Sequence, residues 1–172
     1  MSGPVLVAGL GNIFHGDDGF GVIVVRRLAS AGVPENVRIM DIGIRGIDLG
    51  FALLDEYELV ILIDATARGG APGTLYTIEI RAGDIPDCVQ ESMVNSHGLN
   101  PERVLALAKS MGARLRKVLL MGCEPGVLDR DQSGYIGLSE IVEASVDPAV
   151  QVIQRLIEDF TKKEEVFSHE YV

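Results

Sequence analysis

The sequence has few basic residues and few cysteines. Its 15 lysines and arginines stand against 25 aspartates and glutamates, which gives a formal net charge of −10. Because this charge repels a phosphate backbone, we expect no nucleic-acid partner. The two cysteines, Cys88 and Cys123, are too few for a disulfide framework and match no zinc-site spacing. These scarcities exclude a disulfide scaffold and a cysteine-based zinc module.

Long hydrophobic runs are also lacking. No apolar stretch reaches the roughly 20 residues that a membrane-spanning helix needs, and the first residues, MSGPVLVAG, contain no basic region. We therefore expect no signal peptide, no membrane partner and a cytoplasmic location. The 172 residues, of which 47% are hydrophobic, predict a single domain over 1–172. Within it we expect a compact core at about 4–160 and a frayed tail at 162–172.

Short apolar runs alternate with helical patterns along the chain. The patterns predict strands at 5–8, 37–42, 58–65, 74–81 and 118–123, and helices at 18–30, 47–54, from 101 onward, and 147–160. The strand at 74–81, TLYTIEIR, alternates with period two, which favours an antiparallel edge strand with one wet face. We predict an α/β three-layer sandwich: a mostly parallel, five-stranded twisted sheet with this one antiparallel edge strand and helices on both faces.

A glycine-rich stretch follows the first strand, in the sequence VLVAGLGNIFHGDDGFG from Val5 to Gly21. Glycines permit the tight turn from strand to helix. Asp17 and Asp18 stand where that helix should begin. A carboxylate there can cap free N–H groups and suits the helix dipole, but two adjacent carboxylates are more than a cap requires. A capping pair and a functional pair both remain open.

Other polar residues follow the ends of predicted strands. In α/β sheets, ligands bind at the carboxyl ends of the strands, near the point where strand order reverses. The candidates there are Asp17, Asp18, Asp41, Asp64, Glu124 and the loop residue His97. Carboxylates with one imidazole suit a divalent metal of borderline softness. The candidates lie too far apart in sequence to form a local motif, and a lone loop histidine is more often a surface or capping residue.

Five segments together resemble the maturation proteases of nickel–iron hydrogenases, endopeptidases that trim the C-terminus of the hydrogenase large-subunit precursor. In chain order they are GLGNIFHGDDGFGV at 9–22, LIDA at 62–65, PGT at 72–74, SHGL at 96–99 and MGCEP at 121–125. The resemblance spans about 5–160. It implies that Asp18, Asp64 and His97 form the metal-binding and catalytic set, with Asp18 standing where some relatives have Glu.

The resemblance also implies a partner and a mechanism. The partner is the large-subunit precursor, and the metal is nickel already inserted in that precursor, with cadmium or zinc as surrogates. Asp18 or Asp64 would act as general base on a water. The loop Gly43-Ile44-Arg45-Gly46 differs from the Gly-Gly-Thr typical of relatives, so Gly43, Arg45 and Gly46 are candidates for substrate binding. His15, beside the acidic pair, is a further candidate, although a solvated loop residue is the simpler interpretation.

Two alternative functions fit parts of the sequence. Gly9-Leu10-Gly11 after a strand, with Asp41 ending the next strand, suggests a dinucleotide-binding domain, but residue 14 is Phe where the fingerprint needs Gly. The aspartate pair would also repel a pyrophosphate. The segment Asp129–Glu140 fits a twelve-residue EF-hand calcium loop. The upstream segment, with Pro125 and Gly126, is unsuited to the incoming helix that an EF-hand needs.

Overall fold

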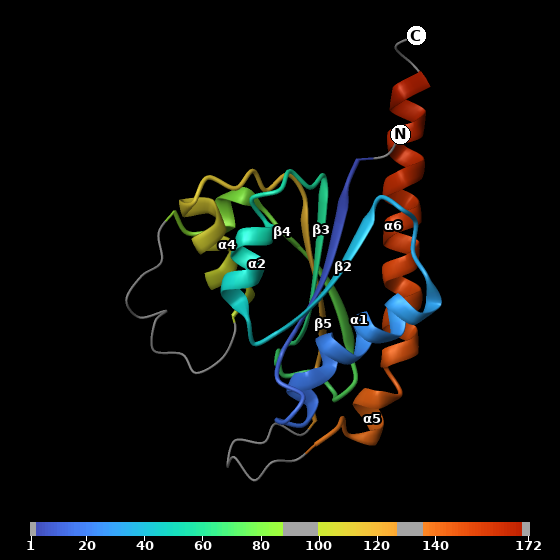
Figure 1. The fold of residues 1–172 in the computed structure, drawn as a ribbon. Coiled ribbons are helices and arrows are strands. Elements are labelled where there is room, and N and C mark those ends of the chain that lie inside the picture. The colour runs from blue at the N-terminus through green and yellow to red at the C-terminus, as the bar shows by residue number, and fades with distance from the viewer. Residues whose placement is uncertain (1–2, 88–99, 127–135, 170–172) are drawn as a thin grey trace.

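The computed structural model describes residues 3–87, 100–126 and 136–169, and side chains within these ranges as far as residue 162 (Figure 1). The strands are β1 (Val5–Leu10), β2 (Val37–Gly43), β3 (Leu59–Ala65), β4 (Leu75–Ile80) and β5 (Val118–Cys123). The α-helices are α1 (Phe20–Ala31), α2 (Gly46–Ala52), α4 (Pro101–Ser110), α5 (Glu140–Glu143) and α6 (Val146–His169). Two short 3₁₀ turns, η1 (Asp17–Gly19) and η2 (Ala82–Asp84), complete the described elements.

The strands form one sheet in the order β2-β1-β3-β5-β4. The first four in this order are parallel, and β4 pairs antiparallel with β5 at the edge. The chain passes from β1 to β2 on one side and then returns to place β3 on the other side of β1. The strand order therefore reverses between β1 and β3, and the crevice at their carboxyl ends is where this class of sheet binds ligands.

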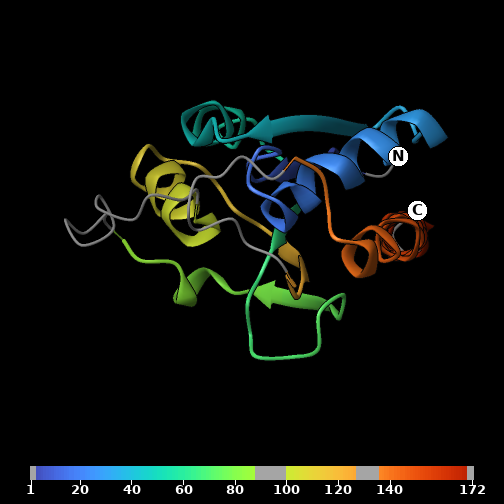
Figure 2. The ribbon, with the colours of Figure 1, turned by 90° about the horizontal axis from the view of Figure 1, so that it is seen from below.

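Helices cover both faces of the sheet (Figures 1 and 2). One core cluster packs the side chains of α1 and α6 against one face, with Phe20, Leu28 and Ile153 fully buried. The other cluster packs α2 and α4 against the opposite face, around Leu49 and Leu105. The predicted three-layer α/β fold is confirmed, including the antiparallel edge strand, and β3 lies at the centre of the sheet.

The helix boundaries differ from the prediction in two places. The helix expected at 18–30 is divided into η1 and α1. The last helix continues to His169, past the predicted end at 160. Its charged C-terminal segment has no apolar period, but lysine and glutamate are good helix formers, and Lys162 pairs with Glu158 one turn earlier. No helix in the described part of the chain is long and apolar enough to cross a membrane.

Two glycines let α1 lie close to the ends of β1 and β3. A side chain on Gly21 would collide with the carbonyl oxygens of Ile63 and Leu10, and one on Gly9 would collide with the carbonyl oxygen of Gly21. The glycine spacing in the first loop therefore serves close helix–sheet packing. This packing holds η1, immediately before α1, against the carboxyl end of β3.

Candidate functional site

The reversal point of the sheet brings Asp18 and Asp64 together. Asp64 is the second-last residue of β3, and Asp18 lies in η1, which follows the loop after β1 and packs against β3. The two carboxylates are close enough for the charge of Asp18 to act on the titration of Asp64. The structure thus brings together two of the three residues that the sequence analysis assigned to the metal and catalytic set.

Asp64 is a buried carboxyl group with a strongly altered proton affinity. Its side chain is 9% exposed, and this burial, together with the negative charge of Asp18, raises its pKa to about 8. A hydrogen bond from the backbone N–H of Ala65 to Oδ1, at 2.9 Å, opposes the shift but does not cancel it. Near neutral pH this group can therefore both hold and release a proton.

Asp18 is half-buried and faces the glycine-rich loop. Its Oδ2 accepts a hydrogen bond from the backbone N–H of Asn12 at 2.7 Å. Gly11, with φ of 115°, lies so close to the Asp18 carbonyl that a side chain there would collide with it. Among the described residues, the ion pairs of lysine and arginine all involve other carboxylates. In the described part of the chain, Asp18 and Asp64 therefore have no lysine or arginine as an ion-pair partner.

Asp17, by contrast, is held by donors from other parts of the chain. It is fully buried and accepts hydrogen bonds from the backbone N–H groups of Gly126 and Ser139 and from the Ser139 hydroxyl. Neither η1 nor α1 has a side-chain cap at its N-terminus. The interpretation of the aspartate pair as a helix cap is therefore wrong, because both carboxylates accept from loop donors elsewhere.

The other two strand-end carboxylates are held in structural contacts. Asp41 forms an ion pair with Arg26 at 2.8 Å, so the acid that a dinucleotide site would use for ribose is already occupied. Glu124 is 5% exposed and accepts from the N–H groups of Arg68 at 2.8 Å and Gly69 at 3.2 Å, and from the Tyr76 hydroxyl at 2.9 Å. These hydrogen bonds lower the pKa of Glu124.

Glu124→Gln should destabilise the fold, because one carboxylate oxygen becomes an NH₂ group that faces a backbone N–H or the tyrosine hydroxyl. We expect the variant to melt several degrees below the wild type at pH 7. The pKa of Glu124 is lower in the folded protein than in the unfolded chain, where it is about 4.3. The ionised carboxylate therefore stabilises the folded state above about pH 4.3, and this contribution is lost as the pH falls through the pKa of the folded protein. The difference between the variant and the wild type should shrink in melts recorded at pH 3. An equal difference at both pH values would contradict this account.

Three features discussed from the sequence lie outside the described residues. His97 and Cys88 lie in 88–99, and most of the proposed calcium loop lies in 127–135. At the end of that loop, Glu140 begins α5. Within the described ranges, no group of three His, Cys, Asp or Glu side chains could hold a metal ion. The third member of the Asp18–Asp64–His97 set therefore stays a prediction.

The candidate substrate-binding residues lie at the same edge of the sheet. The carbonyl of Gly43 accepts from the N–H of Gly11 at 3.0 Å, which joins the loop after β2 to the loop after β1. The guanidinium of Arg45 donates to the carbonyls of Asp41 at 2.6 Å and Ile42 at 3.3 Å, so it braces this loop before Gly46 begins α2. His15 is half-buried, and its carbonyl accepts from the N–H of Asp18. Substrate contact by these residues remains a prediction.

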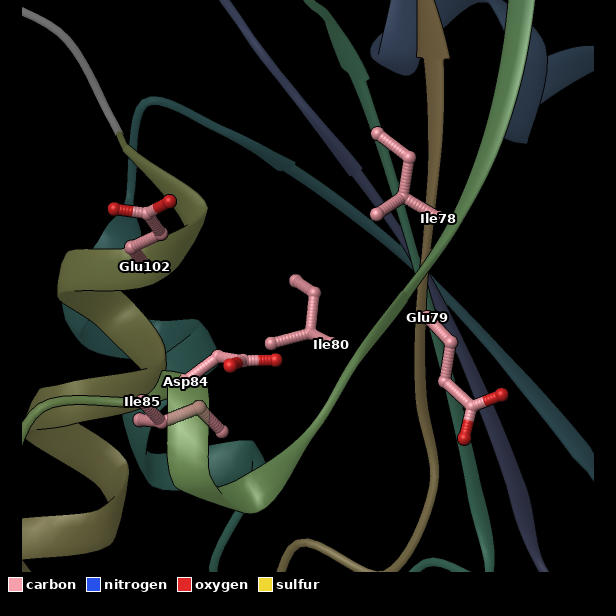
Figure 3. Close-up of a pocket in the computed structure, with 6 residues that line it drawn as sticks. All are labelled: Ile78, Glu79, Ile80, Asp84, Ile85 and Glu102. Atoms are coloured by element: carbon pink, nitrogen blue, oxygen red, sulfur yellow. The ribbon is translucent and has the colours of Figure 1, made fainter.

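Two other features are separate from this chemistry. Cys123 is buried, and the burial raises the pKa of its thiol to about 11, which keeps it protonated and weakly nucleophilic. A pocket at β4 is lined by Ile78, Glu79, Ile80, Asp84, Ile85 and Glu102 (Figure 3). Ile80 pairs with Val118 at the start of β5, whereas Asp64 pairs with Gly122 near its end. The pocket therefore lies toward the opposite end of the sheet from Asp64.

Comparison with known proteins gives the family of the chain. Residues 22–156 match the family model described as hydrogenase maturation protease. The chain belongs to the hydrogenase maturation protease family. A curated relative, hydrogenase expression/formation protein HupD of Rhodobacter capsulatus, is 37% identical over 147 residues, or 85% of this chain and 67% of the relative. The hydrogenase 2 maturation protease of Escherichia coli is 29% identical over 150 residues, 87% of each chain.

Solved structures give the same family and fold. The hydrogenase maturating endopeptidase HybD from E. coli superposes with a TM-score of 0.72 at 26% identity, covering 91% of this chain and 93% of that one. The hydrogenase 2 maturation peptidase of a thaumarchaeon gives a TM-score of 0.67 at 38% identity, covering 90% and 97%. The protease is thus a hydrolase of hydrogenase maturation, with its acidic pair at the reversal point of an α/β sheet.

Proposed function

We propose that this protease removes the C-terminal extension of a nickel–iron hydrogenase large-subunit precursor after nickel insertion, with the precursor's nickel as the recognition signal. The observation that best supports this is the Asp18–Asp64 pair: two neighbouring carboxylates, one of them buried, with no cationic side chain beside them in the described structure. Such a pair is stabilised when a cation arrives. A nickel ion that enters with the substrate would supply this charge.

The donor set suits nickel that is only partly coordinated by its own protein. Carboxylate oxygens from Asp18 and Asp64, with an imidazole from His97, can fill open positions on a divalent ion of borderline softness. Cadmium or zinc should occupy the same donors as surrogates. Because the metal belongs to the substrate, its capture would also place the scissile peptide beside the two carboxylates, and such positioning accounts for a large part of many enzymatic rates.

Within this proposal Asp18 and Asp64 are both ligands of the substrate's metal, and Asp64 is also the general base. In the metal-free protein, burial raises the pKa of Asp64 to about 8, and a base with a pKa near the working pH is effective. Asp64 would accept a proton from a water whose oxygen attacks the scissile carbonyl. It would then return that proton to the leaving amine as the peptide bond breaks.

The direct test is cleavage of a purified large-subunit precursor, prepared with and without nickel. We expect the nickel-loaded precursor to be shortened at its C-terminus and the nickel-free precursor to stay intact, as measured by intact-mass spectrometry. Equal cleavage of both would disprove nickel recognition but leave the endopeptidase activity standing. Absence of cleavage in a matched precursor loaded with nickel would disprove the proposal.

A further inference from the structure

The adjacent residues Asp17 and Asp18 have opposite surroundings. Asp18 is half-buried at the reversal point of the sheet, whereas Asp17 is fully buried. The proposed reaction uses Asp18 and Asp64 and gives Asp17 no task. Burial of a carboxylate is costly unless hydrogen bonds offset the loss of water, so the contacts of Asp17 indicate what this residue does.

Asp17 connects η1 to two distant points of the chain. Its Oδ2 accepts from the N–H of Gly126 at 2.8 Å and from the Ser139 hydroxyl at 2.9 Å, and its Oδ1 accepts from the N–H of Ser139 at 2.6 Å. Gly126 follows β5, and Ser139 directly precedes α5. One carboxylate therefore holds both ends of the segment between β5 and α5 against the turn that contains Asp18.

This anchoring fixes the direction of the neighbouring side chain. In a 3₁₀ turn successive side chains point about 120° apart, so a turn whose first residue is held inward leaves the second little freedom to rotate. In this fixed turn, the Oδ2 of Asp18 accepts a hydrogen bond from the Asn12 N–H at 2.7 Å. Asp18 also lies close enough to Asp64 for its charge to act on that carboxyl group. A rotation of η1 would move Asp18 away from both.

We propose that Asp17 is a positioning residue, whose bonds to Gly126 and Ser139 hold η1 so that Asp18 faces Asp64. The expected effect on cleavage rests on the proposed function, whereas the effect on the Asp18–Asn12 bond does not. Asp17→Asn keeps the shape of the side chain. Its NH₂ group must face either the Ser139 N–H or the Gly126 N–H, so at least one anchoring bond is replaced by a clash of donors.

Two serine variants make a matched pair. Ser139→Ala removes one donor from Asp17 and leaves both N–H bonds in place. Ser145→Ala removes a hydroxyl near the same end of the molecule that donates to the carbonyls of Gly73 and Ile141. Both are serine-to-alanine changes at the β5–α5–α6 corner, so a general loss of stability there affects both variants.

Two measurements on the full-length protein test the proposal. The first is the hydrogen-exchange protection of the Asn12 amide by NMR, which reports on its bond to Asp18 without any substrate. The second is cleavage of nickel-loaded precursor, with kcat and KM measured separately. We expect Asp17→Asn to lower Asn12 protection and to reduce kcat by about 10- to 100-fold. Ser139→Ala should have the same two effects more weakly. Ser145→Ala should change neither Asn12 protection nor kcat.

The outcomes separate the two proposals. The positioning role is overturned if Asp17→Asn lowers the melting temperature but leaves Asn12 protection and kcat at wild-type values. If Asp17→Asn does not fold, the same outcome in Ser139→Ala overturns it. The same holds if Ser145→Ala matches Ser139→Ala in both readouts. If the wild type does not cleave nickel-loaded precursor but Asn12 protection falls selectively in the Asp17 and Ser139 variants, the proposed function fails and the positioning of Asp18 by Asp17 stands.

Discussion

Asp64→Asn should abolish cleavage of the nickel-loaded precursor and, at the same time, stabilise the metal-free protein. An amide cannot take a proton from water, and loss of a general base typically costs about 10²- to 10⁴-fold in rate. The amide oxygen can still accept from the Ala65 N–H as Oδ1 does at 2.9 Å in the wild type. The variant should therefore fold normally, so that its inactivity cannot be attributed to misfolding.

The stability gain should depend on pH in a defined direction. The pKa of Asp64 is about 8 in the folded protein and about 3.9 in an unfolded chain. Between these values the folded state binds more protons than the unfolded state, so the wild-type free energy of unfolding falls as pH rises from about 4 to about 8. Asparagine has no proton to lose. The advantage of Asp64→Asn should grow over this window to a few kcal/mol and stay constant above it.

Urea unfolding at a series of pH values, without metal, measures this difference. Asp18→Asn is the informative control: it removes the like charge but not the burial of Asp64, which is the larger cause of the shift. Its stability should rise with pH relative to the wild type, but less than that of Asp64→Asn. A stability difference for Asp64→Asn that is constant from pH 4 to pH 9, or full cleavage activity in that variant, would refute the role assigned to Asp64.

The fold was largely predictable because its signals are local. Buried parallel strands appear as short apolar runs, as in VLLMGC at 118–123, and the period-two pattern of 74–81 marked the one antiparallel edge strand. The reversal of strand order between β1 and β3 could not be predicted in this way, because no local sequence pattern specifies the order of strands in a sheet. Strand-end position alone therefore pointed to Asp17, Asp18, Asp41, Asp64 and Glu124 without showing which of them belong to the site.

The ranking of these carboxylates depends on partners far away in the sequence. Asp17 and Asp18 are adjacent and chemically identical, yet the donors that occupy Asp17 stand 109 and 122 residues further along the chain. Glu124 is likewise occupied by donors 48 to 56 residues earlier. Only the resemblance to a known family separated Asp18 from Asp17 at the level of sequence. Residue type and spacing could not.

Binding of nickel or cadmium to the metal-free protein should strengthen as pH rises, because the metal must displace the proton of Asp64. Above the ordinary histidine pKa of about 6.5 and below the Asp64 pKa of about 8, the affinity should rise by nearly tenfold per pH unit. At higher pH it should level off, because no further proton is then released from this carboxyl. Isothermal titration of each ion between pH 6.5 and pH 9 measures this slope and the level reached above it.

The same binding provides a test of His97 and of both alternative functions. A ligand that binds only the folded protein raises its melting temperature, so we expect a shift with nickel or cadmium that is lost in His97→Ala and in Asp64→Asn. Calcium and NAD should give no shift in any of the three proteins. A calcium shift that His97→Ala leaves intact would instead support the loop at Asp129–Glu140, and an NAD shift would support the dinucleotide site. Nickel or cadmium binding that is unchanged in His97→Ala would exclude His97 from the metal site. The Asp18–Asp64 pair would then bind the metal without an imidazole, because a cation relieves the repulsion between two carboxylates whether or not a histidine is a further ligand.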